Sequence, residues 1–111
     1  MLLGILNSQA AGGAASAGYF GGGDTGSMVD TVDKFEFPSD SRTTLATGLS
    51  SARNFLAGMA DSGVAGYFGG GYDGASRVTT VDKFAFPSDS RTTLGTGLSS
   101  ARSGVAAMAS A

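Results

Sequence analysis

The sequence contains no cysteine, no histidine and no tryptophan among its 111 residues. The first absence excludes disulfides and thiolate metal sites, and the second removes the commonest general base and transition-metal ligand. Only 14% of the residues are charged and the net charge is −2, so no basic field would recruit nucleic acid. No apolar run approaches the roughly 20 residues that span a bilayer, and the apolar start Met1–Leu6 lacks the basic region of a signal peptide. We therefore expect no enzyme, no cofactor, no metal, no nucleic acid and no membrane contact, and the compartment stays open.

Proline is also scarce, with two residues, whereas the 19 glycines far exceed the average share of about 7%. The sequence also contains a duplicated stretch. Its two copies, Val32–Arg53 and Val81–Arg102, differ only at Glu36/Ala85 and Ala46/Gly95. The block AGYFGGG precedes each copy, at 17–23 and 65–71. The blocks are displaced by 48 residues and the longer copies by 49. A period in this range is typical of arrays of supersecondary units.

Short strands separated by turns account for the repeat. Around Lys34, aromatic and polar residues alternate with a period of two, which is typical of a strand with one buried face. We expect Phe35 and Phe37, like their counterparts Phe84 and Phe86, to point inward. No window keeps an apolar period of 3.6, so helices are not expected. The fold class is therefore all-β, with expected strands Ala17–Phe20, Met28–Phe37, Arg42–Thr47 and Asn54–Ala60, then Val64–Phe68, Arg77–Phe86, Arg91–Thr96 and Ser103–Ala109, and with Ala10–Ala17 either a further strand or part of a flexible terminus.

Three features together resemble the kelch repeat of β-propellers. An aromatic strand ends in Gly-Gly, a Val-Asp-x-x strand carries an aromatic residue, and a Leu-x-x-Ala-Arg segment precedes an Ala-rich strand. These features stand at Tyr19–Gly22 and Tyr67–Gly70, at Phe35 and Phe84, and at Leu49–Arg53 and Leu98–Arg102. The resemblance covers about residues 17–111 and is to a divergent repeat of bacterial or phage type. The kelch signature usually has Tyr where Phe35 and Phe84 stand, and Trp near Leu45 and Leu94.

The resemblance implies kelch-like blades of four antiparallel strands. Residues 1–16 would be a degenerate N-terminal segment, 17–64 the first unit, and 65–111 the second unit, whose last strand belongs to the next blade. Propellers close with about 4–8 blades, so the ring would be completed by oligomerisation or by further sequence. With three or four copies, each would lend a terminal strand to its neighbour. The expected function is non-catalytic binding of a protein or glycan through blade loops. A purely structural self-assembling unit, of a phage particle or extracellular array, and a fragment of a larger propeller enzyme are the alternatives.

The loops in which the two copies differ are the candidate binding sites, because loops carry function while scaffolds carry packing. Tyr72 is interpreted as the extra residue of the second loop, where it is placed to stack on a sugar or to stay exposed without a ligand. Asp24 and Asp73 are possible calcium ligands, but neither loop has the carboxylate density of a dedicated site, which favours turn formation. Arg77 completes the candidate ligand-binding set.

Charged residues that recur at equivalent positions are predicted to be structural, because a catalytic pair would be expected once. Arg53 and Arg102 are expected to bond carbonyls or aspartates between blades, with a ring of arginines around a bound anion as the alternative. The strings at 21–26 and 69–74 match a dinucleotide-binding G-x-G-x-x-G. That site needs a helix N-terminus after the glycines, and a strand is expected instead, so these are predicted to be turn glycines.

Overall fold

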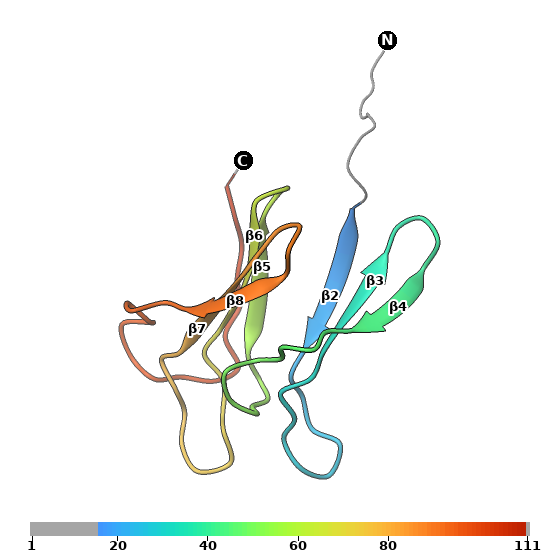
Figure 1. The fold of residues 1–111 in the computed structure, drawn as a ribbon. Coiled ribbons are helices and arrows are strands. Elements are labelled where there is room, and N and C mark those ends of the chain that lie inside the picture. The colour runs from blue at the N-terminus through green and yellow to red at the C-terminus, as the bar shows by residue number, and fades with distance from the viewer. Residues whose placement is uncertain (1–15, 111) are drawn as a thin grey trace.

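The structure, a computed structural model, describes residues 16–110, which form two antiparallel β-sheets lying side by side (Figure 1). Within this range there is no helix, and hence none that is long and apolar enough to cross a membrane. The all-β prediction is therefore confirmed. The first sheet has three strands in the order β2-β3-β4, and the second has four in the order β5-β6-β7-β8.

Three strands of the first copy, β2 to β4, occupy the same places as β6 to β8 of the second copy, and β5 is an additional strand without such a counterpart among the described residues. Their bounds are β2 Ala17–Gly21, β3 Val32–Glu36, β4 Ser41–Thr44, β5 Ala57–Asp61, β6 Ala65–Gly69, β7 Val81–Ala85 and β8 Ser90–Thr93. The registers agree as well: Phe20 lies opposite Asp33 in the first sheet, and Phe68 lies opposite Asp82 in the second. Side chains directly opposite each other share a face of an antiparallel sheet, so the two sheets present the same pattern on each face.

The sheets are out of phase with the sequence repeat. Strand β5 follows Arg53, inside the first sequence unit, but it pairs with β6 of the second unit. Its turn at residues 62–64 is closed by the Val64 amide donating to the Asp61 carbonyl at 2.9 Å. The first sequence unit therefore contributes its last strand to the sheet that follows.

Several predicted strands are shorter than expected, and one is absent. The predicted strand Met28–Phe37 begins only at Val32, because the preceding residues belong to a loop in which the Val29 amide bonds the Gly23 carbonyl. Residues Ser103–Ala109 form no strand, which corrects the prediction made for them. The equivalent residues of β5 are a strand because β6 lies beside them, whereas no described residue pairs with 103–109 in this way. The predicted strand Ala10–Ala17 lies almost entirely outside the described residues.

The buried core is small and lies where the two sheets meet. Its buried members are Val32, Leu49 and Phe84, and Tyr19, Leu45, Leu56 and Phe68 pack against them. The expectation that the paired phenylalanines point inward is correct for Phe84, but Phe37 is 49% exposed. Its counterpart Phe86 stacks on Tyr19 of the first sheet with ring centroids 5.4 Å apart. Phe37 has no such neighbour among the described residues, because it lies on the face that points away from the second sheet.

Candidate functional site

The loop residues singled out from the sequence use their polar groups to hold their own loops. The Asp24 carboxylate accepts a hydrogen bond from the Gly26 amide at 2.8 Å. The Asp73 carboxylate accepts from the amides of Ser76 and Ala75, both at 2.9 Å, and these bonds lower the pKa of Asp73. This is the ordinary chemistry of aspartate in turns, and it agrees with the turn interpretation of both residues.

Tyr72 is not the inserted residue of the second loop. It forms an isolated bridge with Arg77, as Asp24 does with Met28, so Tyr72 and Asp24 occupy equivalent places. The first bridge encloses three residues and the second encloses four, which places the extra residue within 73–76. Sequence alignment alone missed this because the loops share no residues that fix the register.

The structure brings the candidate residues to one end of the molecule, where the two loops lie side by side (Figure 1). A β-carbon added at Gly74 would lie 3.5 Å from the Met28 sulfur. Tyr72 is half-buried; its backbone pairs with Asn54, and its hydroxyl donates to the Gly74 carbonyl at 3.0 Å. Arg77 is exposed. The loops are neighbours, but their side chains do not converge on a common cavity.

The most highly organised polar cluster lies instead between the sheets, around Asp82. Arg53 reaches across from the connection after the first sheet and donates to the Asp82 carboxylate at 3.1 Å, with both side chains 0% exposed. Ser50 donates to the same oxygen from its amide and its hydroxyl, both at 2.9 Å. The Thr93 hydroxyl donates to the other oxygen at 2.7 Å. The prediction that Arg53 bonds an aspartate between units is confirmed.

This environment keeps Asp82 ionised. Burial opposes its ionisation, but hydrogen bonds from the Ser50 amide and the Thr93 hydroxyl, with the charge of Arg53, outweigh burial and lower the pKa of Asp82. The Arg53 Nε atom is buried without a hydrogen-bond partner. The cost of removing both charges from water offsets much of their attraction, so a buried ion pair adds little net stability. Its main effect here is to specify which groups of the two sheets meet.

A second polar cluster joins the sheets at the turn before β8. Asp89 accepts hydrogen bonds from the Tyr19 hydroxyl at 2.6 Å and from the Lys34 ammonium at 2.9 Å. Burial and the hydrogen bond to Asp89 raise the pKa of Tyr19 above its ordinary value. The Lys34 ammonium also lies 5.8 Å from the centre of the Tyr19 ring. Nearby, the Arg91 guanidinium donates to the Gly48 carbonyl at 2.9 Å, so three separate charged contacts tie the sheets together.

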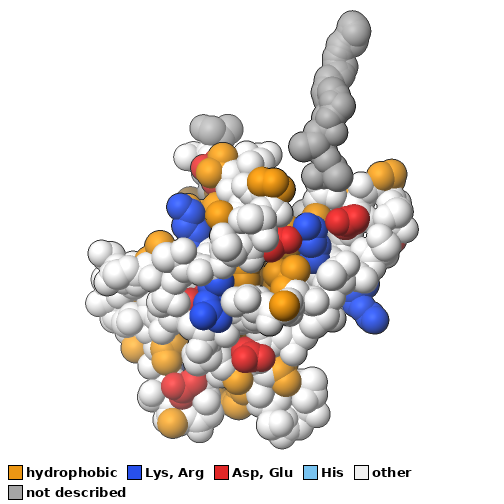
Figure 2. All heavy atoms as spheres, viewed as in Figure 1, with side chains coloured by type: hydrophobic (Ala, Val, Ile, Leu, Met, Phe, Trp, Pro, Cys, Tyr) orange, Lys and Arg blue, Asp and Glu red, His pale blue; other side chains and the backbone are white. Residues whose placement is uncertain are grey.

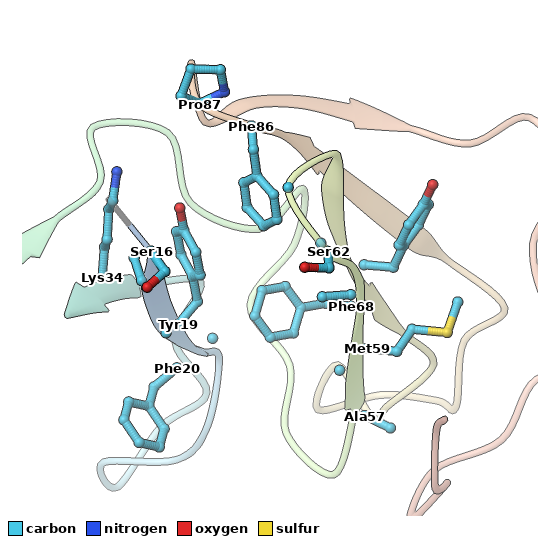
Figure 3. Close-up of a pocket in the computed structure, with 18 of the residues that line it drawn as sticks. Ser16, Tyr19, Phe20, Lys34, Ala57, Met59, Ser62, Phe68, Phe86 and Pro87 are labelled. Carbon is cyan, nitrogen blue, oxygen red and sulfur yellow. The ribbon is translucent and has the colours of Figure 1, made fainter. Parts of the chain in front are cut away.

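A cleft of about 1130 Å³ lies beside these contacts, between β2 and the pair β5 and β6. Figure 3 shows Tyr19 and Phe86 side by side at this cleft, with Phe68 on the wall of the second sheet and Phe20 pointing away from that sheet. Two of the polar groups that line it, the Tyr19 hydroxyl and the Lys34 ammonium, are already bonded to Asp89. Ser16, Glu36 and Ser62 also line the cleft, but most of its walls are apolar side chains and glycines.

No group of three or more carboxylates within 16–110 is close enough to hold a metal ion. Acidic and basic side chains are scattered over the visible face rather than gathered by sign (Figure 2). What this arrangement does chemically is join two sheets through oriented ion pairs and one aromatic stack.

Sequence analysis identified the repeated charges but not which of them meet. Asp82 pairs with Arg53 and Ser50, which precede it by 29 and 32 residues. The available signal was the recurrence of Asp, Arg and Ser at fixed positions of both copies. The signal could not show that one copy's arginine serves the other copy's aspartate.

No protein-family model and no curated protein matches this sequence. The resemblance to kelch repeats therefore stays a prediction from the sequence, and the two packed sheets establish only the all-β class.

Proposed function

We propose that this chain is a non-catalytic, kelch-like β-propeller module whose main activity is assembly with further blades like its own. In this proposal each sheet is a blade, and the contact between the two sheets is the contact between successive blades. The observation that carries it is the use of the repeated charges. Arg53, Asp82 and Asp89 form hydrogen bonds that join one sheet to the next, and they do not line a common cavity.

The segment after Arg102 supports this proposal. Residues Val105–Ala109 read VAAMA, and the equivalent residues Leu56–Ala60 read LAGMA and lead into β5. In the second sheet, β5 pairs with β6 over its whole length. The later segment thus has the composition of a first strand, equivalent to β5, for a following sheet, which agrees with the expectation that a copy lends its terminal strand to its neighbour.

The experiment that tests the proposed function is the mass of the intact chain in solution, measured by native mass spectrometry and sedimentation equilibrium over a range of concentrations. We expect a discrete oligomer, three or four copies for a ring within the usual 4–8 blades. A folded monomer at all concentrations would refute the proposal, because two blades alone leave sheet faces and strand edges uncovered.

A second candidate function is binding of a protein or glycan through the loops at 24–28 and 72–77. The proximity of Met28 to Gly74 favours it, because it makes the two loops one surface. Replacing Arg77 by Ala tests this idea: binding to a glycan or protein panel should fall while thermal stability is retained. If no member of the panel binds the wild type, loop recognition is refuted and the assembly proposal is unaffected.

A further inference from the structure

We propose that a second copy of this chain docks head to tail onto the first, through two open faces that repeat the contact already made between the two sheets. The first open face, on the first sheet, consists of Phe20, Asp33, Phe35, Phe37 and Asp40. The second open face, on the second sheet, consists of Tyr67, Gly69, Lys83, Ser99 and Arg102. This inference rests on the proposed function and adds to it the partner, the orientation and the residues that meet.

The donors and acceptors of the two carboxylate clusters between the sheets have counterparts on the open faces, where no described residue of another sheet bonds them. The contact of Arg91 with the Gly48 carbonyl has Arg42 and Gly97 as its counterparts. Inside the chain, Arg53 and Ser50 bond Asp82, and Tyr19 and Lys34 bond Asp89. The counterparts of the donors are Arg102, Ser99, Tyr67 and Lys83, all on the second open face. The counterparts of the two acceptors are Asp33 and Asp40, on the first open face. Placed on each other, the open faces would form the same four pairings.

The apolar contacts are complementary in shape as well. Between the sheets, the Phe68 ring lies against Gly21, so closely that an added β-carbon there would be 2.8 Å from its Cζ. On the first open face, the counterpart Phe20 is 73% exposed. On the second, the counterpart Gly69 lines a cavity of about 180 Å³ walled by Val81, Leu98 and Val105. A β-carbon at Gly69 would meet nothing closer than 3.5 Å within the chain, so the place that Phe68 fills inside is vacant here.

The open faces already hold their side chains in the bound arrangement. Lys83 lies 5.8 Å from the centre of the Tyr67 ring, as Lys34 does from Tyr19. Thr44 donates to Asp33 at 2.6 Å, as Thr93 donates to Asp82 at 2.7 Å. Phe20 and Phe35 meet edge to face at 5.8 Å, as Phe68 and Phe84 do at 6.0 Å. Little side-chain freedom is left to lose on docking, which favours association.

The charges set the orientation. Asp33 and Asp40 outnumber Arg42 on the open face of the first sheet, which is therefore net acidic. Lys83 and Arg102 outnumber Asp61 on the open face of the second sheet, which is net basic. Two copies that met through identical faces would place like charges against each other, which disfavours a two-fold dimer. A head-to-tail contact closes into a ring when its rotation permits and otherwise grows into a filament.

The test uses two variants of the intact chain, each of which disables one open face. Arg102→Glu removes the donor from the second face, and Asp33→Asn removes the charge that Arg102 would pair with on the first. Neither residue takes part in the contact between the sheets, so both variants should fold, as far-UV circular dichroism will check. Matched controls are Arg77→Glu and Asp24→Asn, which make the same charge changes at exposed loop sites outside both faces.

By sedimentation velocity, each face variant alone should associate at least about 100-fold more weakly than the wild type, because a buried charge would lack its partner. The two controls should behave as the wild type. Mixed in equal amounts, the two face variants should form a dimer and stop there, because each supplies the intact face that the other lacks.

The wild type must associate for the proposed function to stand, so a monomeric wild type overturns both proposals. An associating wild type whose two face variants also associate overturns only the head-to-tail contact. Association of Arg102→Glu but not of Asp33→Asn would indicate a two-fold contact between first open faces, and it too overturns this inference. A further variant, Gly69→Ala, should leave the fold intact and weaken association about tenfold by filling the vacancy for Phe20.

Discussion

The buried cluster around Asp82 leads to a prediction that can be measured against a control within the same chain. Asp82→Ala removes the acceptor for Arg53, for the amide and hydroxyl of Ser50 and for the hydroxyl of Thr93. The guanidinium that remains is 0% exposed and cannot turn into water without parting the two sheets. The substitution therefore removes one charge and leaves the other buried.

Removing one partner of a buried ion pair typically costs about 3–5 kcal/mol in the free energy of unfolding. Domains of this size are stable by about 5–15 kcal/mol, so the expected loss is a large part of the total. Asp33→Ala changes the same residue type at the same position of the repeat. There, Thr44 is the only side chain within residues 16–110 that donates to the carboxylate, at 2.6 Å, and a single hydrogen bond contributes about 1 kcal/mol.

Both substitutions should be made in the Arg102→Glu background, where the proposed association is blocked and the folding of one copy is measured. Urea unfolding followed by far-UV circular dichroism and tyrosine fluorescence gives the two free energies of unfolding. We expect Asp82→Ala to lose at least twice as much as Asp33→Ala. Equal losses would refute the reasoning, because they would show that the contact between the sheets contributes nothing beyond the hydrogen bonds within each sheet.

Gly21→Ala should lower the free energy of unfolding in urea by about 1–3 kcal/mol, because the added carbon overlaps the Phe68 ring. Its control, Gly69→Ala, should change this free energy by less than about 0.5 kcal/mol. An unchanged stability of Gly21→Ala would contradict the close contact. The lowered pKa of Asp82 means that its carboxylate stabilises the fold above the ordinary aspartate pKa of about 3.9 and that this stabilisation is lost as the pH falls from there through the folded-state pKa. Asp82→Asn should therefore flatten the acid limb of a stability–pH profile, and an unchanged slope would count against the ion pair. Burial and the hydrogen bond to Asp89 raise the pKa of Tyr19. The neutral phenol therefore stabilises the fold below a pH of about 10, and this stabilisation is lost as the pH rises from there through the higher folded-state pKa. In an ultraviolet titration one tyrosine should ionise late, and Tyr19→Phe should abolish that late step.

The strands could be predicted from the sequence where alternation and turn residues are local properties. The strand around Lys34 follows from the alternation of neighbouring residues along the chain. The predictions that Phe37 points inward and that Ser103–Ala109 form a strand were wrong, because both properties depend on which other segment lies beside these residues. An aromatic residue is buried only when another sheet covers it, and an extended segment becomes a strand only when a partner supplies hydrogen bonds.

The candidate site shows the same division. The turn roles of Asp24 and Asp73 could be predicted, because their hydrogen bonds reach only two or three residues along the chain. The partnership of Arg53 with Asp82 spans 29 residues and two sheets, and nothing in local sequence identifies it. Repetition was the useful signal, since it marked both residues as structural before their contact was known.

The phase difference between sequence unit and sheet has a consequence for how such a chain can change in length. Because β5 is encoded with the first unit and pairs in the second sheet, a unit carries half of the junction that follows it. Gene duplication or deletion by a whole period therefore leaves every junction with both of its halves. Such a protein can vary its number of units without inventing a new interface, and a single substitution copied through the array alters every junction alike.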